Sequence, residues 1–183
     1  PYQGLVGLIT PYNIEVTART SGGAEVRMRR TMQTVGIPVF QFGMFSEPDL
    51  SFHAGANFNF GGRVHTNASL YLAQGTGTTL TFRDKITAFT QVKRDTLMNG
   101  AAITTSNHTG TVSVPTDIGS AWRNLLSTES SGTTAAPWSG WDTLSKVTYN
   151  TNIRTQATGA KQLNLPLAQA GAQPVDLVRR PVV

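Results

Sequence analysis

Three histidines, at positions 53, 65 and 108, are the residues of this sequence best suited to metal binding or proton transfer. None of them stands at the i, i+4 spacing of a helical metal site, and no group of acids accompanies them. His65 and Asn67 project to the same side of an expected strand, where an imidazole and an amide could share an ion or a sugar hydroxyl. A locally hydrogen-bonded or solvent-facing pair is the simpler interpretation. The sequence therefore predicts no metal site and no cofactor.

The acidic residues and hydroxyl groups do not form the arrangements that catalysis needs. General acid and base chemistry requires two carboxylates in one pocket, whereas the ten Asp and Glu residues are scattered singly. Asp84 and Asp95 flank one expected strand, but Lys85 and Arg94 stand beside them and suggest local ion pairs. Cysteine is absent, and neither a Gly-x-Ser-x-Gly elbow nor a phosphate-binding glycine loop occurs. We expect no catalytic residue and no enzyme; a carbohydrate-active site on a stacked β-structure stays open as an alternative.

Four arginines, Arg19, Arg27, Arg29 and Arg30, form the strongest charge cluster of a chain whose formal net charge is +5. Strand alternation puts Arg27 and Arg29 on one face, with Arg19 on the facing strand of an expected hairpin. Two or three phosphate contacts would give a salt slope of only about −2 to −3, which means weak binding. A solvated face or a salt-bridged subunit contact is the simpler interpretation. Binding of a polyanion, such as DNA or an acidic polysaccharide, is our alternative function.

The elements that carry these residues begin with a hairpin. Apolar and polar residues alternate over 12–18 and again over 26–32, and Ser-Gly-Gly at 21–23 separates the two runs. This pattern predicts two half-buried antiparallel strands joined by a glycine turn. We expect the second strand to continue past Pro38 into an aromatic ridge that packs in the core or between subunits, with the residues Phe40, Phe42, Phe45, Phe58 and Phe60.

Short strands with polar corners follow between Gly61 and Val114, a pattern typical of a sandwich, a barrel or a β-solenoid. An internal repeat favours the solenoid. The segments 63–67 and 85–89 put Val64 and Ile86 in equivalent places, and Leu70 then matches Val92 at the same offset. Coils of about this length bury apolar residues inward in stacked rungs.

The last third is irregular in pattern. Trp122, Leu125 and Leu126 at i, i+3 and i+4 predict one short helix near 119–129. Short edge strands are expected at Val147, Ile153, Leu163, Leu165 and Leu167. The fold class we expect is all-β, with a hairpin leading into short stacked strands, β-solenoid-like or alternatively a sandwich. We expect a single β-rich domain or fragment over 1–183, made up of a hairpin and apolar ridge in 1–49, a short-strand ladder in 50–115 and an irregular part in 116–183.

Composition bears on the compartment. Only 14% of the residues are charged, well below the usual quarter, and Gly, Ser, Thr and Asn are abundant, which suits extracellular β-proteins. The most apolar stretch, 35–45, is too short for a membrane span. The chain opens at Pro1 without a signal peptide and stops at Val183 without a closing element. We expect a segment of a longer exported protein, extracellular or on the cell surface, with its anchor outside this segment.

One stretch carries a family resemblance. The string Phe-Asn-Phe-Gly-Gly-Arg-Val-His-Thr-Asn at 58–67, followed by Leu-Tyr-Leu-Ala at 70–73 and Ile-Thr-Ala at 86–88, resembles PilX-like pilus-assembly proteins. With weaker similarities on either side, the resemblance spans residues 11–181. In that family a membrane helix precedes a β-rich region, and there are no assigned catalytic residues to carry over.

The resemblance implies a structural or adhesive cell-surface module of a bacterial pilus or extracellular filament. Its partners would be other copies of itself or pilin subunits. The physical pattern agrees with such a role, because short exposed strand edges can be matched by a neighbouring chain. We expect strand addition along the hairpin and subunit packing along the aromatic ridge.

Overall fold

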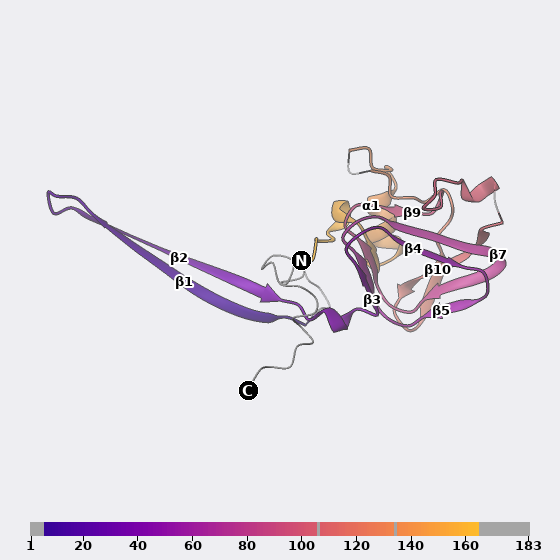
Figure 1. Ribbon diagram of the computed structural model, residues 1–183, viewed down its shortest axis with the longest axis horizontal. Helices are drawn as coiled ribbons and strands as arrows, with labels where there is room; N and C mark the ends of the chain where they lie inside the picture. Colours follow the sequence, from indigo (N-terminus) through magenta and orange to yellow (C-terminus); the bar gives the residue numbers. More distant parts are fainter. Residues whose placement is uncertain (1–5, 106, 134, 165–183) are drawn as a thin grey trace, which may run out of the picture. The chain divides into compact units, whose positions relative to one another are not determined.

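The computed structural model describes residues 6–164 except 106 and 134, and groups them in two compact units (Figure 1). The first unit ends at Gln41 and the second begins at Phe42. We expected one domain with internal boundaries near residues 49 and 115, and the structure divides the chain once, between Gln41 and Phe42.

The first unit is a β-hairpin, as the alternation of residues 12–32 predicts. Strand β1 (Leu8–Arg19) pairs antiparallel with β2 (Glu25–Gly36) along their whole length. The turn forms at the predicted glycines. Gly23 has a φ of +84°, which a side chain would strain, and its amide donates to the Thr20 carbonyl at 3.0 Å. The predicted hairpin is confirmed, and Figure 1 shows it as a long two-stranded ribbon.

Two expectations for this unit are wrong. The strands are not half-buried: every residue of β1 is exposed, and only Val35 of β2 is partly covered, because the unit has no second sheet layer. In addition, β2 ends at Gly36 and does not continue through an aromatic ridge. Pro38, which lacks an amide hydrogen, is followed by a 3-10 turn, η1 (Val39–Gln41), whose Gln41 amide donates to the Pro38 carbonyl at 3.2 Å. Phe40 is 84% exposed on this turn.

One sheet of the second unit consists of four short parallel strands in the order β12-β8-β6-β3. In register, Met44 stands opposite Val64, Val64 opposite Ile86, and Ile86 opposite Ile153. Because side chains alternate between the two faces of a strand, the aligned residues form one column on the inner face. The bounds of the strands are β3 (Met44–Ser46), β6 (Val64–Thr66), β8 (Ile86–Ala88) and β12 (Ile153–Arg154).

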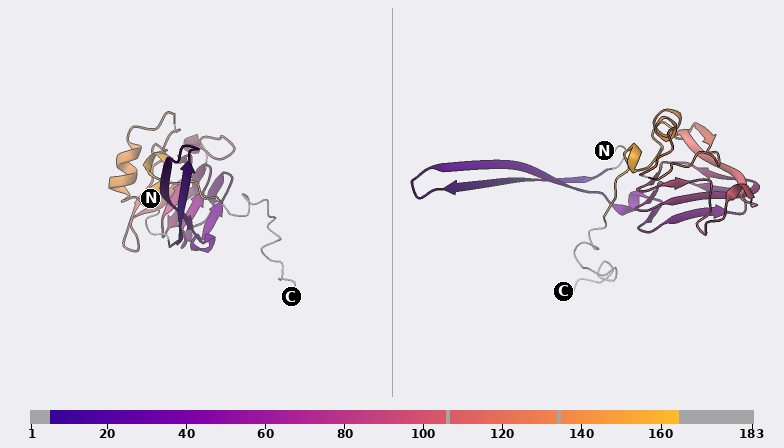
Figure 2. Two further views of the ribbon diagram at one scale, coloured as in Figure 1. Left: turned by 90° about the vertical axis from the view of Figure 1, so that its left-hand side faces the viewer. Right: turned by 90° about the horizontal axis from the view of Figure 1, so that it is seen from above.

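The other sheet of this unit has six strands and is organised around the long strand β7 (Figure 2). Strands β4 and β9 pair with the first half of β7, and β5 and most of β10 pair with its second half, all in parallel. Strand β11 closes one edge by antiparallel pairing with β10. The bounds are β4 (Leu50–Ala54), β5 (Phe58–Phe60), β7 (Leu70–Phe82), β9 (Val92–Lys93), β10 (Thr109–Asp117) and β11 (Ala121–Asn124).

The internal repeat predicted from the sequence is confirmed as a structural register. Val64 pairs with Ile86 in one sheet and Leu70 pairs with Val92 in the other, each across an offset of 22 residues. The β-rich character of the fold is also confirmed. The antiparallel β10 and β11 pair and the helical turns of the last third depart from a uniform parallel stack.

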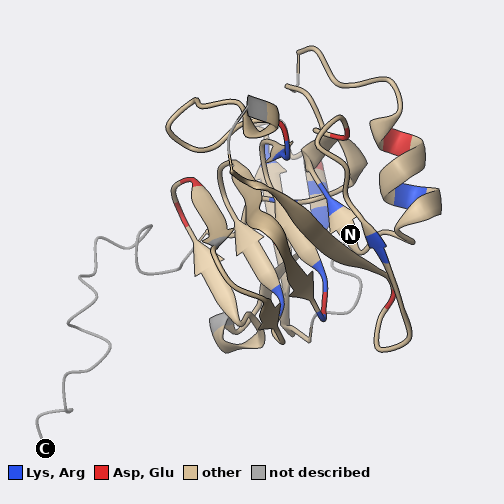
Figure 3. Cartoon of the chain, turned by 90° about the vertical axis from the view of Figure 1, so that its right-hand side faces the viewer, with Lys and Arg blue, Asp and Glu red and all other residues tan. Residues whose placement is uncertain are grey.

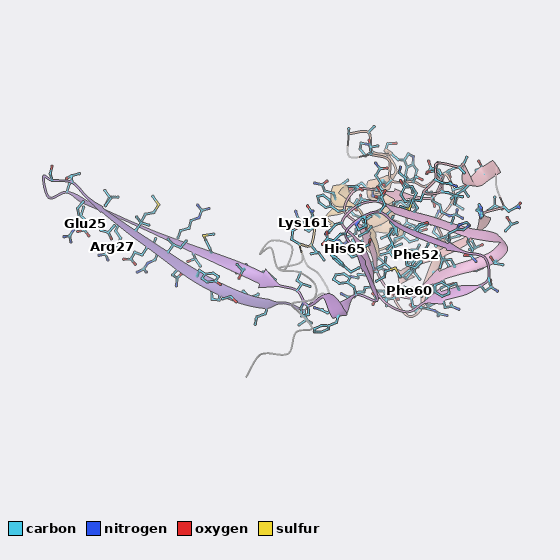
Figure 4. The ribbon with its side chains drawn as sticks, in the orientation of Figure 1. Glu25, Arg27, Phe52, Phe60, His65 and Lys161 are labelled. Carbon is cyan, nitrogen blue, oxygen red and sulfur yellow. The ribbon has the colours of Figure 1, made fainter. Side chains whose placement is uncertain are left out.

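The core of the second unit fills the space between these strands with stacked aliphatic and aromatic side chains. Leu70, Leu80 and Ile86 are completely buried, and burial of each such side chain contributes about 1.5–3 kcal/mol. Phe52 and Phe60 lie side by side in Figure 4, with ring centroids 5.3 Å apart, and Phe82 meets the Phe52 ring edge-on at 5.0 Å. Charged residues are sparse on the ribbon of this unit (Figure 3).

The helix predicted near 119–129 is wrong, since β11 lies there. The chain reverses at Gly119, whose φ of +86° permits a tight turn between β10 and β11. Trp122 then stabilises the strand, because its indole Nε1 donates to the Phe82 carbonyl at 2.8 Å. The helical residues come later, in α1 (Trp141–Thr143) and a π-helical turn, η3 (Leu144–Thr148).

The expected edge strands of the last third are confirmed only in part. Ile153 lies in β12, but Val147 is exposed in η3 and Leu163 lies outside any strand. Leu165 and Leu167 fall outside the described residues. Two further 3-10 turns are η2 (Ile103–Thr105) and η4 (Gln156–Thr158). Over the described ranges, no helix combines the length and apolar character that crossing a membrane requires.

Candidate assembly surface and histidine clusters

The hairpin presents one continuous apolar face. Alternation puts Val16 opposite Met28, Tyr12 opposite Met32 and Ala18 opposite Val26 on the same side of the ribbon. The large side chains of this face are between 45% and 67% exposed. We call the following six residues the apolar hairpin face: Tyr12, Ile14, Val16, Val26, Met28 and Met32.

The opposite face of the hairpin carries three of the four clustered arginines. Arg29 Nη2 lies 2.9 Å from Glu15 Oε2, Arg27 Nε lies 3.3 Å from Glu15 Oε1, and Arg19 Nε lies 2.5 Å from Glu25 Oε2. Figure 4 labels Glu25 and Arg27 on neighbouring positions of this face. The prediction that these arginines share a face is confirmed. Two glutamates offset much of their charge, so the face is an ion-pair ladder more than a cationic patch.

Arg30 lies on the other side of the ribbon, opposite Ile14 within the apolar hairpin face. The sequence grouped it with its three neighbours, but alternation separates it from them. Among the described residues no salt bridge to Arg30 is formed. A partner that covers the apolar face would therefore need a polar or acidic group opposite Arg30, which makes the choice of partner more specific.

Both outer edges of the hairpin are open as well. Strands β1 and β2 make up a sheet of their own, so among the described residues each has a hydrogen-bonding partner on one side only. A lone two-stranded hairpin is marginally stable in water, and open edges are templates for pairing with another chain. The hairpin therefore combines an uncovered apolar face with two unpaired edges of 12 residues each.

The five phenylalanines predicted to pack between subunits do not form one ridge. Phe42 and Phe45 lie 5.9 Å apart and both contact His65, while Phe60 packs against the core at Phe52. Phe58 is 43% exposed beside Phe60, at a centroid distance of 6.4 Å. Phe40 belongs to the first unit and the other four to the second. Only Phe40 and Phe58 retain much exposed surface for a partner.

His65, which Figure 4 labels, lies in a buried polar cluster on β6. Its Nδ1 is 2.7 Å from Thr87 Oγ1 and its Nε2 is 3.0 Å from Asn67 Oδ1. The Asn67 amide in turn pairs with the backbone of Leu163: Oδ1 accepts from the amide at 2.9 Å, and Nδ2 donates to the carbonyl at 2.7 Å. Asn67 Nδ2 also donates to Glu47 Oε2 at 2.7 Å.

These contacts settle the chemistry of His65. Because Leu163 fixes the orientation of the Asn67 amide, the amide oxygen faces the ring and His65 Nε2 must donate to it. Burial lowers the pKa of His65, against the opposing effects of the Asn67 hydrogen bond and the Glu47 charge. The predicted local hydrogen bond between His65 and Asn67 is confirmed. Through Asn67, the cluster holds Leu163 beside β6.

His53 and His108 form a second cluster that the sequence did not indicate. His53 Nε2 lies 2.6 Å from His108 Nδ1, and the rings meet edge-on with centroids 4.0 Å apart. His53 is exposed near the end of β4, and His108 is half-buried immediately before β10. Burial first, and the neighbouring His108 second, lower the pKa of His53. The separation of 55 positions hides this pair from any local motif search.

The acid and base neighbours expected to form local pairs take other partners. Asp84 forms an ion pair with Arg63 and not with the Lys85 ammonium; Arg63 Nε lies 3.4 Å from Asp84 Oδ2. Arg94 is buried and donates to the Gly110 carbonyl at 2.6 Å and to the Leu125 carbonyl at 3.1 Å, and no carboxylate among the described residues pairs with it. Burial lowers its pKa. The Asp84 and Arg94 side chains therefore both hold segments of the β-structure together.

A bidentate ion pair of the second unit joins β11 to the following loop. Arg123 donates to both oxygens of Glu129, at 2.6 and 2.9 Å, and to the Tyr149 hydroxyl at 2.8 Å. Burial raises the pKa of Tyr149 to about 12, although the hydrogen bond from Arg123 opposes the shift. For Glu129 burial also raises the pKa, but the hydrogen bonds from Arg123 and the Leu126 amide outweigh it and leave the pKa lowered. The group is a fixed bidentate salt bridge.

Comparison with known proteins places no further constraint on the chain. No protein-family model, no curated protein and no solved structure matches it. Within the described ranges, no three side chains among His, Cys, Asp and Glu are grouped to hold a metal ion. The hairpin offers a partner an exposed apolar face, a row of ion pairs and two open strand edges.

Proposed function

We propose that this chain is a structural module of a bacterial pilus or extracellular filament, and that the hairpin is its assembly element. The module is exported, lies outside the cell or on its surface, and associates with other copies of itself or with pilin subunits. The observation that carries the proposal is the apolar hairpin face. Its large side chains are exposed, because the unit contains no second layer that covers them. Contiguous exposed apolar surface of this kind marks interaction sites.

The energetics favour a multivalent assembly over an isolated dimer. Six large side chains, each about half exposed, would contribute about 5 to 9 kcal/mol if a partner buried the remainder, at about 1.5–3 kcal/mol for each complete side chain. Association of two free molecules costs about 4–15 kcal/mol in lost motional freedom. The face alone therefore leaves little net affinity. Strand pairing at the edges, repeated along a filament, supplies the additional contacts.

The body suits a scaffold role. We infer a short β-solenoid-like stack, supported by the parallel pairing and by the offset of 22 residues shared by both sheets. A sandwich, the alternative, is less consistent with strands that pair in parallel in both sheets. A stack of this kind is held together by local columns of side chains.

The family resemblance supports the same conclusion from a separate direction. The segment at 58–67 that resembles PilX-like pilus-assembly proteins contributes β5, β6 and the buried His65 cluster. These residues stabilise the stack, in keeping with a structural role. An adhesive role would use the same exposed surfaces with a different partner.

Binding of a polyanion remains the second candidate function, with less support. Arg19, Arg27 and Arg29 share one hairpin face, but each guanidinium already contacts a glutamate. A phosphate would have to displace these ion pairs, so its contact would gain less than contact with a free arginine.

The experiment compares two substitutions at neighbouring positions on opposite faces of β1. Val16→Lys puts a charge into the apolar hairpin face, whereas Thr17→Lys puts the same charge on the face with the ion pairs. We expect self-association, measured by light scattering after gel filtration, and copurification with pili to be lost in Val16→Lys and kept in Thr17→Lys. A wild-type chain that stays monomeric and ignores every pilus component would contradict the proposal.

A further inference from the structure

The second unit brings two imidazole rings, those of His53 and His108, into direct contact. His53 and His108 come from segments far apart in the sequence, yet their ring nitrogens converge to 2.6 Å on the outside of the β-structure. His53 is exposed and His108 is half-buried, so solvent and small ions reach the pair. The third histidine, His65, is buried with both ring nitrogens engaged.

We propose that His53 and His108 form a binding site for a divalent transition metal ion of the imidazole-preferring kind, such as Zn²⁺, Ni²⁺ or Cu²⁺. Neutral imidazole is a good ligand for these ions, and Mg²⁺ or Ca²⁺ requires oxygen ligands instead. Two imidazoles occupy two coordination positions, and water completes the shell.

The proton balance of the site is simple. In the hydrogen bond between the rings, one of the two facing nitrogens carries a hydrogen and the other accepts it. When a metal binds, the donating ring shifts to its other tautomer, so that its hydrogen moves to the nitrogen on the far side. Both facing lone pairs are then free, and no net proton is released.

The geometry requires only a small adjustment. Zinc-to-nitrogen distances of about 2.0–2.1 Å at a tetrahedral angle separate two ligand nitrogens by roughly 3.3 Å. The facing nitrogens are 2.6 Å apart, so they must separate by less than about 1 Å. Both are ring atoms of side chains with exposed surface, for which such a rotation is readily available.

The backbone around the site is held in register. Ala54 pairs with Gln74, and Gln74 pairs with Thr109, so the residues that directly follow the two histidines lie on either side of β7. Between them, His53 pairs with Ala73, whose methyl group leaves room for the two rings to meet. A metal would therefore link β4 to the start of β10 across β7. This pre-arranged spacing distinguishes the pair from two unrelated surface histidines.

The test is a calorimetric titration of the whole chain with ZnCl₂, with MgCl₂ as the negative control. We expect one zinc ion per chain, and an affinity at least about tenfold lower in His53→Gln and in His108→Gln, since loss of a direct ligand costs no less than loss of its supporting contacts. His65→Gln should leave zinc affinity unchanged. Zinc binding that is equal in the wild type and both single variants, or the lack of any binding by the wild type, would overturn the proposal.

Zinc should also raise the melting temperature of the wild type, because it binds the folded chain and links two strands. Each single variant should lose this increase while keeping the melting temperature of the metal-free wild type within a few degrees. An increase that persists in both variants would show that the zinc acts elsewhere and would likewise overturn the proposal. These readouts do not depend on the hairpin or on assembly.

Discussion

Leu70 offers the sharpest test of the stacked columns that support the body. It is completely buried on β7, and the register places Leu50 on one side of it and Val92 on the other. Leu70→Ala removes three buried carbon atoms from a position whose neighbours are held by backbone pairing. Such substitutions cost about 2–5 kcal/mol, and because the paired neighbours can relax only in part, we expect a cost of about 3–4 kcal/mol here.

The assay is urea unfolding followed by tryptophan fluorescence. All three tryptophans, Trp122, Trp138 and Trp141, lie in the second unit, so the signal reports on the body and not on the hairpin. With a slope of about 2 kcal/mol per molar urea, the expected loss lowers the midpoint by about 1.5–2 M. Leu126→Ala is the matched control, because Leu126 is 45% exposed and should cost less than about 1 kcal/mol. Equal midpoints for the two variants would refute the packed column.

Three further predictions follow from the polar contacts. Stability should fall as the pH drops below about 6.5, since the pKa of His65 is lowered in the folded chain and the unfolded chain then binds the extra proton; His65→Gln should flatten this slope in unfolding curves recorded between pH 5 and 8. Asn67→Ala should lower the free energy of unfolding by about 2–3 kcal/mol, because it leaves the buried polar groups of His65 and Leu163 without their hydrogen-bond partner. Asn59→Ala, on an exposed strand position, should cost less than about 1 kcal/mol. Arg27→Ala and Arg29→Ala should leave elution from heparin nearly unchanged if the ion pairs occupy these side chains; markedly earlier elution would instead favour polyanion binding.

The hairpin and the repeat could be predicted because both depend on residue patterns within short segments of the chain. Alternation on either side of Gly22 and Gly23 leaves one pairing register, and two similar segments at equal offsets can stack in parallel only with Val64 beside Ile86. What the alternation could not show is whether anything covers the apolar side. A pattern that predicts burial is satisfied equally by packing within the chain and by packing against a partner, and here the unit itself leaves that face open.

The errors have similar causes. The spacing of Trp122, Leu125 and Leu126 fits a helix and also fits a strand with a following loop, and Gly119 decides for the strand by allowing the tight turn from β10. The His53 and His108 contact depends on how β4 and β10 align with β7, which no spacing within one segment reveals. The phenylalanines were grouped by their types, but the turn at η1 and the alternation of β5 send them to different environments.

We propose that a partner covers the hairpin in the assembled state. Amide hydrogen exchange of β1 and β2, measured by mass spectrometry in the free chain and in pili or filaments that contain it, tests this most directly. We predict rapid exchange in the free chain, because β1 and β2 pair only with each other and are exposed, and strong protection of both strands after assembly. Exchange in the hairpin that is equally fast in both states, with protection confined to the body, would contradict the account.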